Sequence, residues 1–141
     1  MDRLPHALPL LVTAFGGKVF AVDRATGDIV WKFLLVRGDV VELAIDDQVV
    51  IACTNRVLAF LDYATGREIK YIVRDDVAAG GTRPTMLVDD HNIYITGSGT
   101  VACYTTHGDL LWEQKFSGEG LGNAAIGFPG KVRQADDPGH R

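Results

Sequence analysis

Residues 21–31, AVDRATGDIVW, decide the fold of this chain, because two related stretches follow them. Residues 59–70, AFLDYATGREIK, carry one extra residue and end in Lys70, whereas residues 102–112, ACYTTHGDLLW, restore both the length and the final tryptophan. The glycines that the stretches share are 39 and 42 residues apart, at Gly27, Gly66 and Gly108. A recurrence of this length is typical of propeller blades or solenoid repeats, so we expect an array of similar units.

Each unit has the same order of hydrophobic and turn-forming segments. Alternating runs rich in Val, Ile, Phe and Tyr are bounded by Gly and Asn turns, which favours strands over helices. The expected strands are residues 10–15, 19–23 and 29–35, then 49–54, 57–62 and 68–73, then 93–97, 100–105 and 110–116. A further run precedes the second unit at 40–45 and the third at 85–88. The sequence therefore predicts an all-β fold made of blades of four antiparallel strands, in units of about 8–38, 39–81 and 82–122.

Length and composition limit the classes of protein that the chain can belong to. Its 141 residues suit one domain, 1–141, and 47% hydrophobic with 23% charged residues is typical of a soluble globular protein. A net charge of −4 gives no electrostatic reason to expect nucleic acid or a membrane as a partner. The apolar run 8–14 is short and contains Pro9, unlike a signal peptide, and Cys53 and Cys103 show no disulfide pattern. We expect a cytoplasmic protein.

Pairs of aspartates follow the two additional runs. Asp46 and Asp47 end the first of these runs, and Asp89 and Asp90 end the second. A calcium loop needs alternating oxygen donors and a glycine within about a dozen residues, and these pairs stand alone one unit apart. They are better explained as hairpin turns, and no metal site is predicted.

The recurring glycines and tryptophans have separate structural roles. Each glycine lies where a hairpin turn needs a positive φ, which glycine adopts without steric cost. Trp31 and Trp112 follow their glycines by four residues and fall on the last strand of a unit. A buried ring of this size is large enough to hold one blade against the next.

The complete motif of residues 21–31 resembles the tryptophan-docking repeat of PQQ-dependent quinoprotein propellers and of their cofactor-free relatives. The resemblance extends over the whole chain and implies that each Trp stacks between a motif glycine and an alanine of the adjacent blade. The second copy has Lys70 in place of Trp, and the third has Tyr104 and His107 where the first has Asp23 and Thr26. The implied docking residues are Ala21, Asp23, Thr26, Gly27, Trp31, Ala59, Asp62, Thr65, Gly66, Ala102, Gly108 and Trp112.

The resemblance does not imply a bound quinone. Enzymatic members of the family use a vicinal disulfide, a coplanar Trp, a calcium ion and six to eight blades. This sequence has no Cys-Cys pair, and both of its tryptophans belong to the repeat. We therefore expect no cofactor. Similar cofactor-free repeats serve in scaffolding, outer-membrane protein assembly and extracytoplasmic kinase sensors, so the family indicates the fold more than the function.

The two ends of the array look complementary. The first unit begins almost at its second strand, whereas residues 123–128 resemble the first strand of a fourth unit and precede a tail, 129–141. Because propellers usually have four to eight blades, we expect two copies to form a six-bladed head-to-tail dimer in which 123–128 pairs beside 10–15 of the other chain. The alternatives are a fragment of a longer propeller and an open array covered by its tail. The candidate interface residues are Lys70, Asn123, Ile126 and Phe128.

No catalytic motif is found, and His6, His91, His107 and His140 are scattered over a terminus, turns and a tail. The sequence predicts a non-enzymatic protein-interaction or scaffold module that has itself and an unidentified protein as partners. One alternative is a carbohydrate-binding propeller, with candidates Tyr63, Tyr71, Tyr104 and His107. A second is a degenerate quinoprotein or small-ligand binder that uses Glu42 and Arg83 in its channel.

Overall fold

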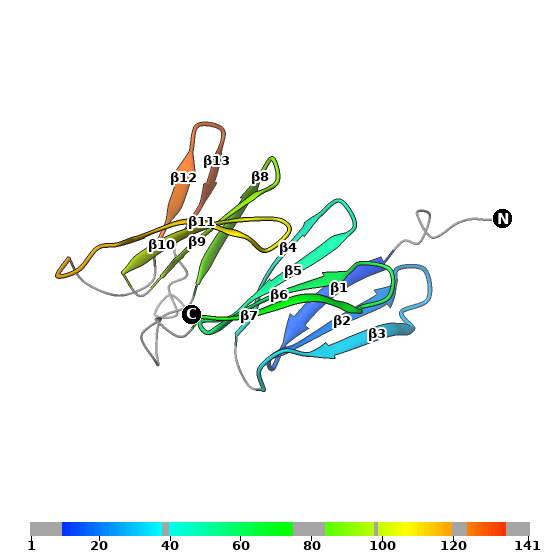
Figure 1. Ribbon diagram of the computed structural model, residues 1–141. Helices are drawn as coiled ribbons and strands as arrows, with labels where there is room; N and C mark the ends of the chain where they lie inside the picture. Colours follow the sequence, from blue (N-terminus) through cyan, green and yellow to red (C-terminus); the bar gives the residue numbers. More distant parts are fainter. Residues whose placement is uncertain (1–9, 38–39, 75–83, 98, 120–123, 135–141) are drawn as a thin grey trace.

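The computed structural model describes residues 10–37, 40–74, 84–97, 99–119 and 124–134. All regular structure in this part of the chain is β-strand, arranged as three sheets side by side and a small hairpin (Figure 1). Every pair of neighbouring strands is antiparallel. The expected all-β fold of propeller blades is confirmed.

The sheets follow one another along the chain, and each is a meander. The first contains β1 (Leu10–Phe15), β2 (Lys18–Asp23) and β3 (Ile29–Leu34). The second contains β4 (Glu42–Asp46), β5 (Val49–Cys53), β6 (Val57–Asp62) and β7 (Glu68–Val73). The third contains β8 (Thr85–Asp89), β9 (Asn92–Gly97), β10 (Thr100–Thr105) and β11 (Leu110–Lys115). The hairpin contains β12 (Ile126–Phe128) and β13 (Lys131–Arg133).

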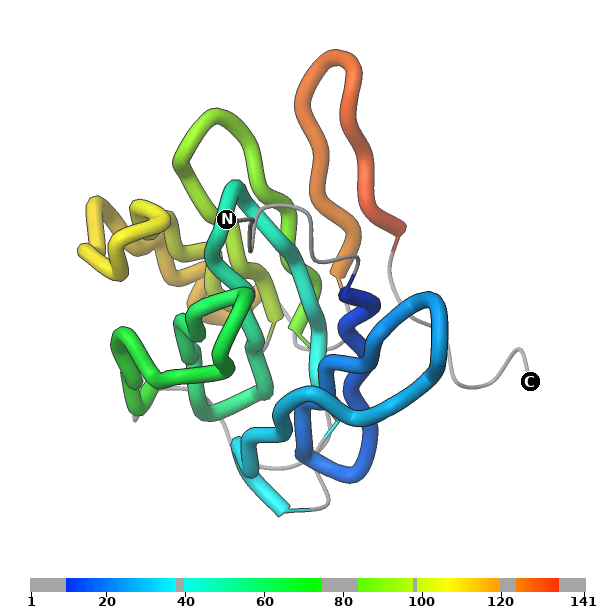
Figure 2. Tube along the Cα trace, turned by 90° about the vertical axis from the view of Figure 1, so that its right-hand side faces the viewer, coloured from blue at the N-terminus to red at the C-terminus, as the bar shows by residue number. Residues whose placement is uncertain are grey.

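The first strands of the blades lie toward one side of the array. β4 is next to β8, and the β12–β13 hairpin lies beside β8 (Figures 1 and 2). The first sheet has three strands within the described residues, and its β1 corresponds to the second strand, β5 and β9, of the other sheets.

The aspartate pairs form tight turns. Cross-strand pairing of Asp46 with Val49, and of Asp89 with Asn92, leaves two residues in each loop. Asp47 and Asp90 have positive φ angles of 56° and 47°, a conformation that aspartate tolerates. The described residues contain no group of three or more His, Cys, Asp or Glu that could hold a metal ion.

The hydrophobic core consists of two seams, which we name by the sheets that they join. Seam 1–2 lies between the first and second sheets, and seam 2–3 between the second and third. Residues 50–53 of β5 are fully buried because the second sheet has a neighbour on both faces. This position explains why β5 and β6 are hydrophobic on both faces, whereas β1 alternates between buried and exposed residues.

The C-terminal region differs from the prediction of one strand and a tail. β12 spans only three residues, and three residues of the expected tail form β13, which pairs with it. Pro129 and Gly130 form the turn between them, and the φ of 92° at Gly130 is the positive value that the third residue of a type II turn requires. Asn123 and Arg83 lie outside the described residues. Within the described part of the chain, no helix has the length and hydrophobicity needed to cross a membrane.

Candidate assembly site at the blade seams

The glycine turns that precede the last strand of each blade share one backbone conformation. Gly27, Gly66 and Gly108 have φ angles of 81°, 75° and 90°, as expected. In the first turn, Asp23 Oδ1 accepts a hydrogen bond from the Ala25 amide at 2.7 Å. In the second, Asp62 Oδ2 accepts hydrogen bonds from the amide and the hydroxyl of Thr65, at 3.0 and 2.8 Å. The aspartate therefore fixes the turn by binding its own backbone.

The third turn is one residue shorter, and Thr105 takes the place of the aspartate. Its Oγ1 accepts hydrogen bonds from the amides of His107 and Asp109, at 3.2 and 3.1 Å. Placing Tyr104 at the aspartate position is wrong, because the Thr105 amide donates to the Asp109 carbonyl just as the Asp23 and Asp62 amides donate across their own turns.

The register also aligns the three blades with one another. The residue directly opposite the seam side chain within the same blade is Ala21 in the first blade, facing Trp31. In the second blade Phe60 faces Lys70, and in the third Cys103 faces Trp112. Ala59 and Ala102 lie one residue earlier and are fully buried, Ala59 in the same core cluster as Trp31 and Ala102 in the core of seam 2–3. When Phe60 rather than Ala59 is aligned with Ala21, the first and second stretches have the same length.

Trp31 joins the first two blades. Its side chain is only 7% exposed and lies against Gly66, where an added Cβ would approach the ring carbon Cδ2 to 2.4 Å. The indole Nε1–H donates a hydrogen bond to the Tyr63 carbonyl at 2.8 Å. The ring therefore packs on the glycine turn of the next blade, with its polar group satisfied.

Lys70 makes the corresponding contact at seam 2–3. An added Cβ on Gly108 would approach Lys70 Cδ to 2.5 Å, so the lysine stem occupies the place of the indole. Nζ donates a hydrogen bond to the Gly108 carbonyl at 3.0 Å and lies 3.7 Å from a carboxylate oxygen of Asp109. Lys70, predicted at an interface between copies, thus lies between two blades of one chain.

A second position, four residues after the seam side chain, was missed in the sequence. Leu35, Arg74 and Phe116 are equivalent there, because their amides donate to the Gly17, Arg56 and Gly99 carbonyls at 2.8, 2.6 and 2.8 Å. Leu35 and Arg74 are 5% and 6% exposed, whereas Phe116 is 47% exposed. The spacing of four residues from each Trp or Lys is the signal that could have identified this position.

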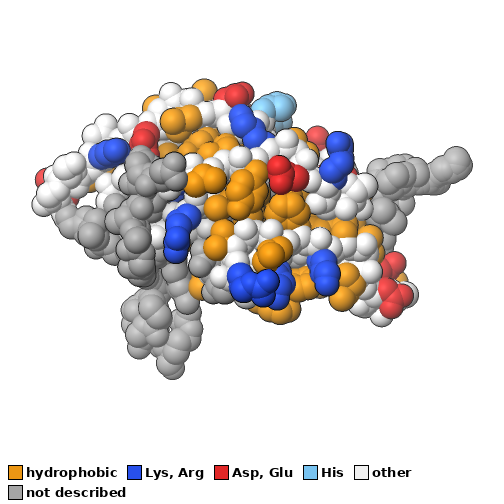
Figure 3. Space-filling model, turned by 60° about the horizontal axis from the view of Figure 1, so that its bottom comes forward, with side chains coloured by type: hydrophobic (Ala, Val, Ile, Leu, Met, Phe, Trp, Pro, Cys, Tyr) orange, Lys and Arg blue, Asp and Glu red, His pale blue; other side chains and the backbone are white. Residues whose placement is uncertain are grey.

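The two outer faces of the array carry the unpaired halves of the same contact. Trp112 is 47% exposed on β11, and no further blade of the described residues lies against it, so it does not have the buried position expected of a docking ring within one chain. At the other end, an added Cβ on Gly27 would meet nothing within 4 Å. Leu11 is 56% exposed, although its equivalent in the second blade, Val50, is fully buried. Figure 3 shows one face on which hydrophobic side chains gather between lysines and arginines.

The hairpin covers part of the Trp112 face. The ring of Phe128 contacts Tyr94 edge-on at 6.1 Å between centroids, and Tyr94 lies 6.4 Å from Trp112. Lys131 Nζ donates a hydrogen bond to the Val88 carbonyl at 2.7 Å. Ile126, also a predicted interface residue, is half-buried on the same hairpin.

Glu42, one of the two predicted channel residues, contacts the C-terminal hairpin. Its carboxylate accepts a hydrogen bond from the guanidinium of Arg133, so the hairpin is also joined to the second blade. Arg83, its predicted companion, lies outside the described residues. No pair of channel residues can therefore be assigned among those that the structure describes.

No protein-family model matches the sequence, and no curated protein matches it. Solved structures do match. BamB from Moraxella catarrhalis is 22% identical with a TM-score of 0.56, and the match covers 75% of this chain and 32% of that one. Quinohemoprotein alcohol dehydrogenase from Comamonas testosteroni is 18% identical with a TM-score of 0.58, covering 77% of this chain and 20% of that one. The computationally designed Ika8 protein is 16% identical with a TM-score of 0.66, covering 89% and 39%.

These similarities support a quinoprotein-like β-propeller fold. The chain spans about a third of the length of BamB and about a fifth of that of the dehydrogenase. It therefore accounts for only part of a ring of the size found in those proteins.

Proposed function

We propose that this chain is a β-propeller module that acts by binding other proteins and completes its ring with a second copy of itself. In the proposed dimer, Trp112 of each chain packs on the Gly27 turn of the other, as Trp31 packs on Gly66 within one chain. The observation that carries the proposal is that Trp112 and Gly27 are the exposed and uncovered halves of this contact. A two-fold arrangement uses both halves twice and leaves neither outer face open.

The number of blades supports two copies rather than three. Each chain supplies three sheets, and two chains make a ring of about six blades, within the usual range of about four to eight. Three copies would exceed that range. The hairpin lies beside β8, where a following blade would place its first strand, and the first sheet has no strand in that position among the described residues.

Binding rather than catalysis is the role that we propose for this ring, with no quinone cofactor. Two buried, free thiols, Cys53 and Cys103, support a proposed location in the reducing cytoplasm. A closed ring would present its turns on two faces to a protein partner. The activities named for the solved relatives belong to much longer chains and are not carried over.

The test is the solution mass by light scattering after size-exclusion chromatography, over a hundredfold range of protein concentration. We expect a dimer of about twice the 15.3 kDa chain for the wild type. Trp112→Ala should weaken the dimer at least about 100-fold, because each dimer loses two buried rings. Leu111→Ala is the matched control. Leu111 is 52% exposed, and the equivalent residue of the first blade, Val30, is 47% exposed although the seam beside it is closed. Leu111 should therefore stay exposed in the dimer, and its removal should not weaken the dimer.

A second pair of variants tests the other half of the contact. Gly27→Asn keeps a residue that tolerates positive φ but places a side chain where the ring would lie, so it should also give monomers. Gly118→Asn is the control, because Gly118 has the same φ of 81° and equally open space. A monomeric wild type would overturn the proposal, as would a dimer unaffected by both Trp112→Ala and Gly27→Asn.

A further inference from the structure

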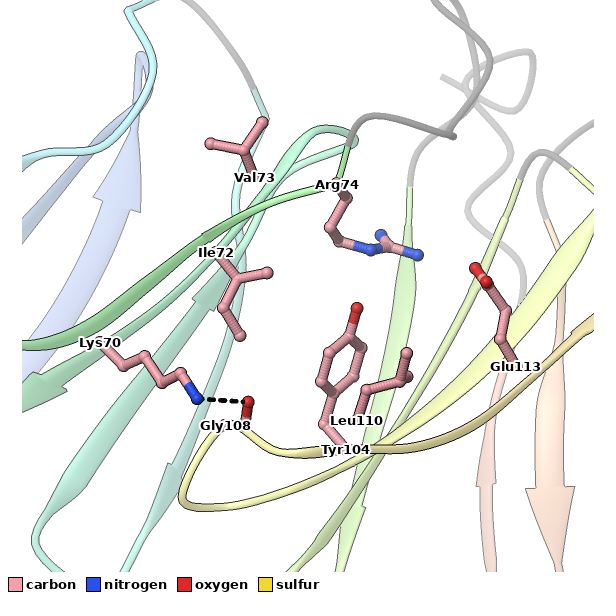
Figure 4. A pocket seen from close by; sticks show the side chains of 8 residues that line it. All are labelled: Lys70, Ile72, Val73, Arg74, Tyr104, Gly108, Leu110 and Glu113. Atoms are coloured by element: carbon pink, nitrogen blue, oxygen red, sulfur yellow. Dashed lines mark hydrogen bonds between the residues drawn. The ribbon is translucent and has the colours of Figure 1, made fainter.

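Seam 2–3 contains a cavity, which we call the seam pocket. It has a volume of about 490 Å³ and is lined by Lys70, Ile72, Arg74, Tyr104, Leu110 and Glu113, among others. These residues come from β7 and the residue after it on one side, and from β10 and β11 on the other (Figure 4). The pocket is therefore built by two adjacent blades of the same chain.

Beside this pocket, the two seam positions hold residues of another type than at seam 1–2. At seam 1–2 these positions hold Trp31 and Leu35, two apolar side chains that are 7% and 5% exposed. At seam 2–3 they hold Lys70 and Arg74. The lysine stem covers Gly108 and is slimmer than an indole ring. The same exchange replaces two apolar groups by two cations.

Arg74 is the unusual member of this pair. It is only 6% exposed, yet its guanidinium points into the pocket toward the region between Tyr104 and Glu113 (Figure 4). Burying a guanidinium is costly unless anionic or hydrogen-bonding groups face it. Its planar fork matches a carboxylate with two parallel hydrogen bonds. The Tyr104 hydroxyl points toward the same space and can donate a third (Figure 4).

We propose that the seam pocket binds a small carboxylate ligand that also carries hydroxyl or amino groups. Arg74 and Tyr104 would hold the carboxylate, and Lys70 would add positive charge from the other end of the pocket. The Glu113 carboxylate points toward the guanidinium across the pocket, beside the space where the hydroxyl or amino groups would lie (Figure 4). Ile72 and Leu110 provide the apolar wall for carbon atoms. The proposal does not depend on the ring being closed.

Titrations followed by ¹H–¹⁵N spectra of the intact protein test this site. The probes are D-glucuronate, L-malate and L-glutamate, which separate a sugar acid, a hydroxy acid and an amino acid as the source of the carboxylate. D-glucuronamide is the neutral counterpart. We expect at least one carboxylate to bind with a Kd below about 1 mM and to shift the amides of Ile72, Gly108 and Leu110. Absence of binding at about 10 mM, or equal binding of the neutral amide, would overturn the proposal.

Variants then identify the groups that recognise the ligand. Lys70→Met keeps the stem on Gly108 but removes the charge, and Tyr104→Phe removes only the hydroxyl, so each should weaken binding about tenfold while leaving other amide signals in place. Lys32→Met, at an exposed position on β3, is the charge-matched control and should not change the affinity. Arg74→Lys should weaken binding more, because an ammonium lacks the two-pronged geometry. Unchanged affinity in all three pocket variants would contradict the assignment.

Discussion

Three glycines with nearly the same backbone conformation differ in what lies above them. Gly66 is covered by the Trp31 ring and Gly108 by the Lys70 stem, whereas Gly27 faces open space. Positive φ explains why glycine is favoured at all three positions. At Gly66 and Gly108 there is a second reason for glycine within the chain, because a side chain there would collide with Trp31 or Lys70 across the seam. Glycine substitutions can therefore separate the cost of the turn from the cost of the seam.

The comparison of Gly27→Ala with Gly66→Ala measures this difference. In the Trp112→Ala background, where no ring of a second copy covers Gly27, Gly27→Ala should lower the free energy of unfolding by about 1–2 kcal/mol, the cost of a left-handed alanine. Gly66→Ala should cost at least about 2 kcal/mol more, because the new methyl group would lie 2.4 Å from a ring carbon of Trp31. Urea denaturation of both variants provides the measurement. Equal losses would mean that the ring moves freely off the turn.

Cys53 makes stability depend on alkaline pH. Burial raises the pKa of its thiol from 9.0 to about 12, and the nearby Arg74 lowers it by less. Between these values the unfolded thiol loses its proton while the folded thiol keeps it, so stability falls as the pH rises. The loss should reach about 1.4 kcal/mol per pH unit. Cys53→Ala should show a shallower decline above pH 9 in urea denaturation, and an unchanged slope would contradict the assignment.

At the scale of elements, the two seams differ at two positions, and the difference at the first, Trp31 in one seam and Lys70 in the other, can be reversed. Lys70→Trp should place an indole on Gly108 as Trp31 lies on Gly66, and should raise the free energy of unfolding by about 1–2 kcal/mol through buried apolar area. It should also fill the seam pocket and abolish carboxylate binding. Lys32→Trp, on exposed β3, should change stability by less than about 0.5 kcal/mol. A destabilised Lys70→Trp protein would show that the second blade has adapted to the lysine.

The strands were predictable because alternation is a local signal. The bounds predicted for β6 and β7 agree with the structure, since each strand is a hydrophobic run that begins shortly after a turn. The register was not predictable. A bulge precedes each glycine turn, and nothing in the sequence shows whether Ala59 or Phe60 faces Lys70. β13 was missed because three residues are too few to show alternation.

The site was predictable only where one residue carries the contact by itself. The spacing of four between glycine and tryptophan placed Trp31 beside a neighbouring blade. It could not distinguish Trp31 from Trp112, because the burial of a ring depends on whether another blade follows. Arg74 was missed for a related reason. An arginine after an exposed strand resembles a surface residue until the opposite wall of the seam is known.

At the scale of the whole molecule, the array exposes one face at each end that its middle blade buries. Val50 and Ile51 of β5 point to opposite seams and are both fully buried. Their equivalents at the two ends of the array are Leu11 and Tyr94. Leu11 is 56% exposed. Tyr94 is half-buried, and its ring lies near those of Trp112 and of Phe128 in the hairpin. Large apolar faces of this kind are typical of interaction surfaces. Closure by a second copy predicts that folding and assembly are coupled.

Coupled folding and assembly make thermal stability depend on protein concentration. If two copies form a ring, the unfolding temperature of the wild type should rise with concentration, because association stabilises the folded state by mass action. Trp112→Ala should unfold at a temperature that does not depend on concentration. Trp31→Ala should lose about 3–5 kcal/mol of stability within each chain and keep the dependence on concentration, since its ring lies inside seam 1–2. Scanning calorimetry of the three proteins over a hundredfold range separates these effects. If the unfolding temperature of the wild type did not change with concentration, the Trp112 face would not be closed by a second copy, because closure by association must make stability depend on concentration.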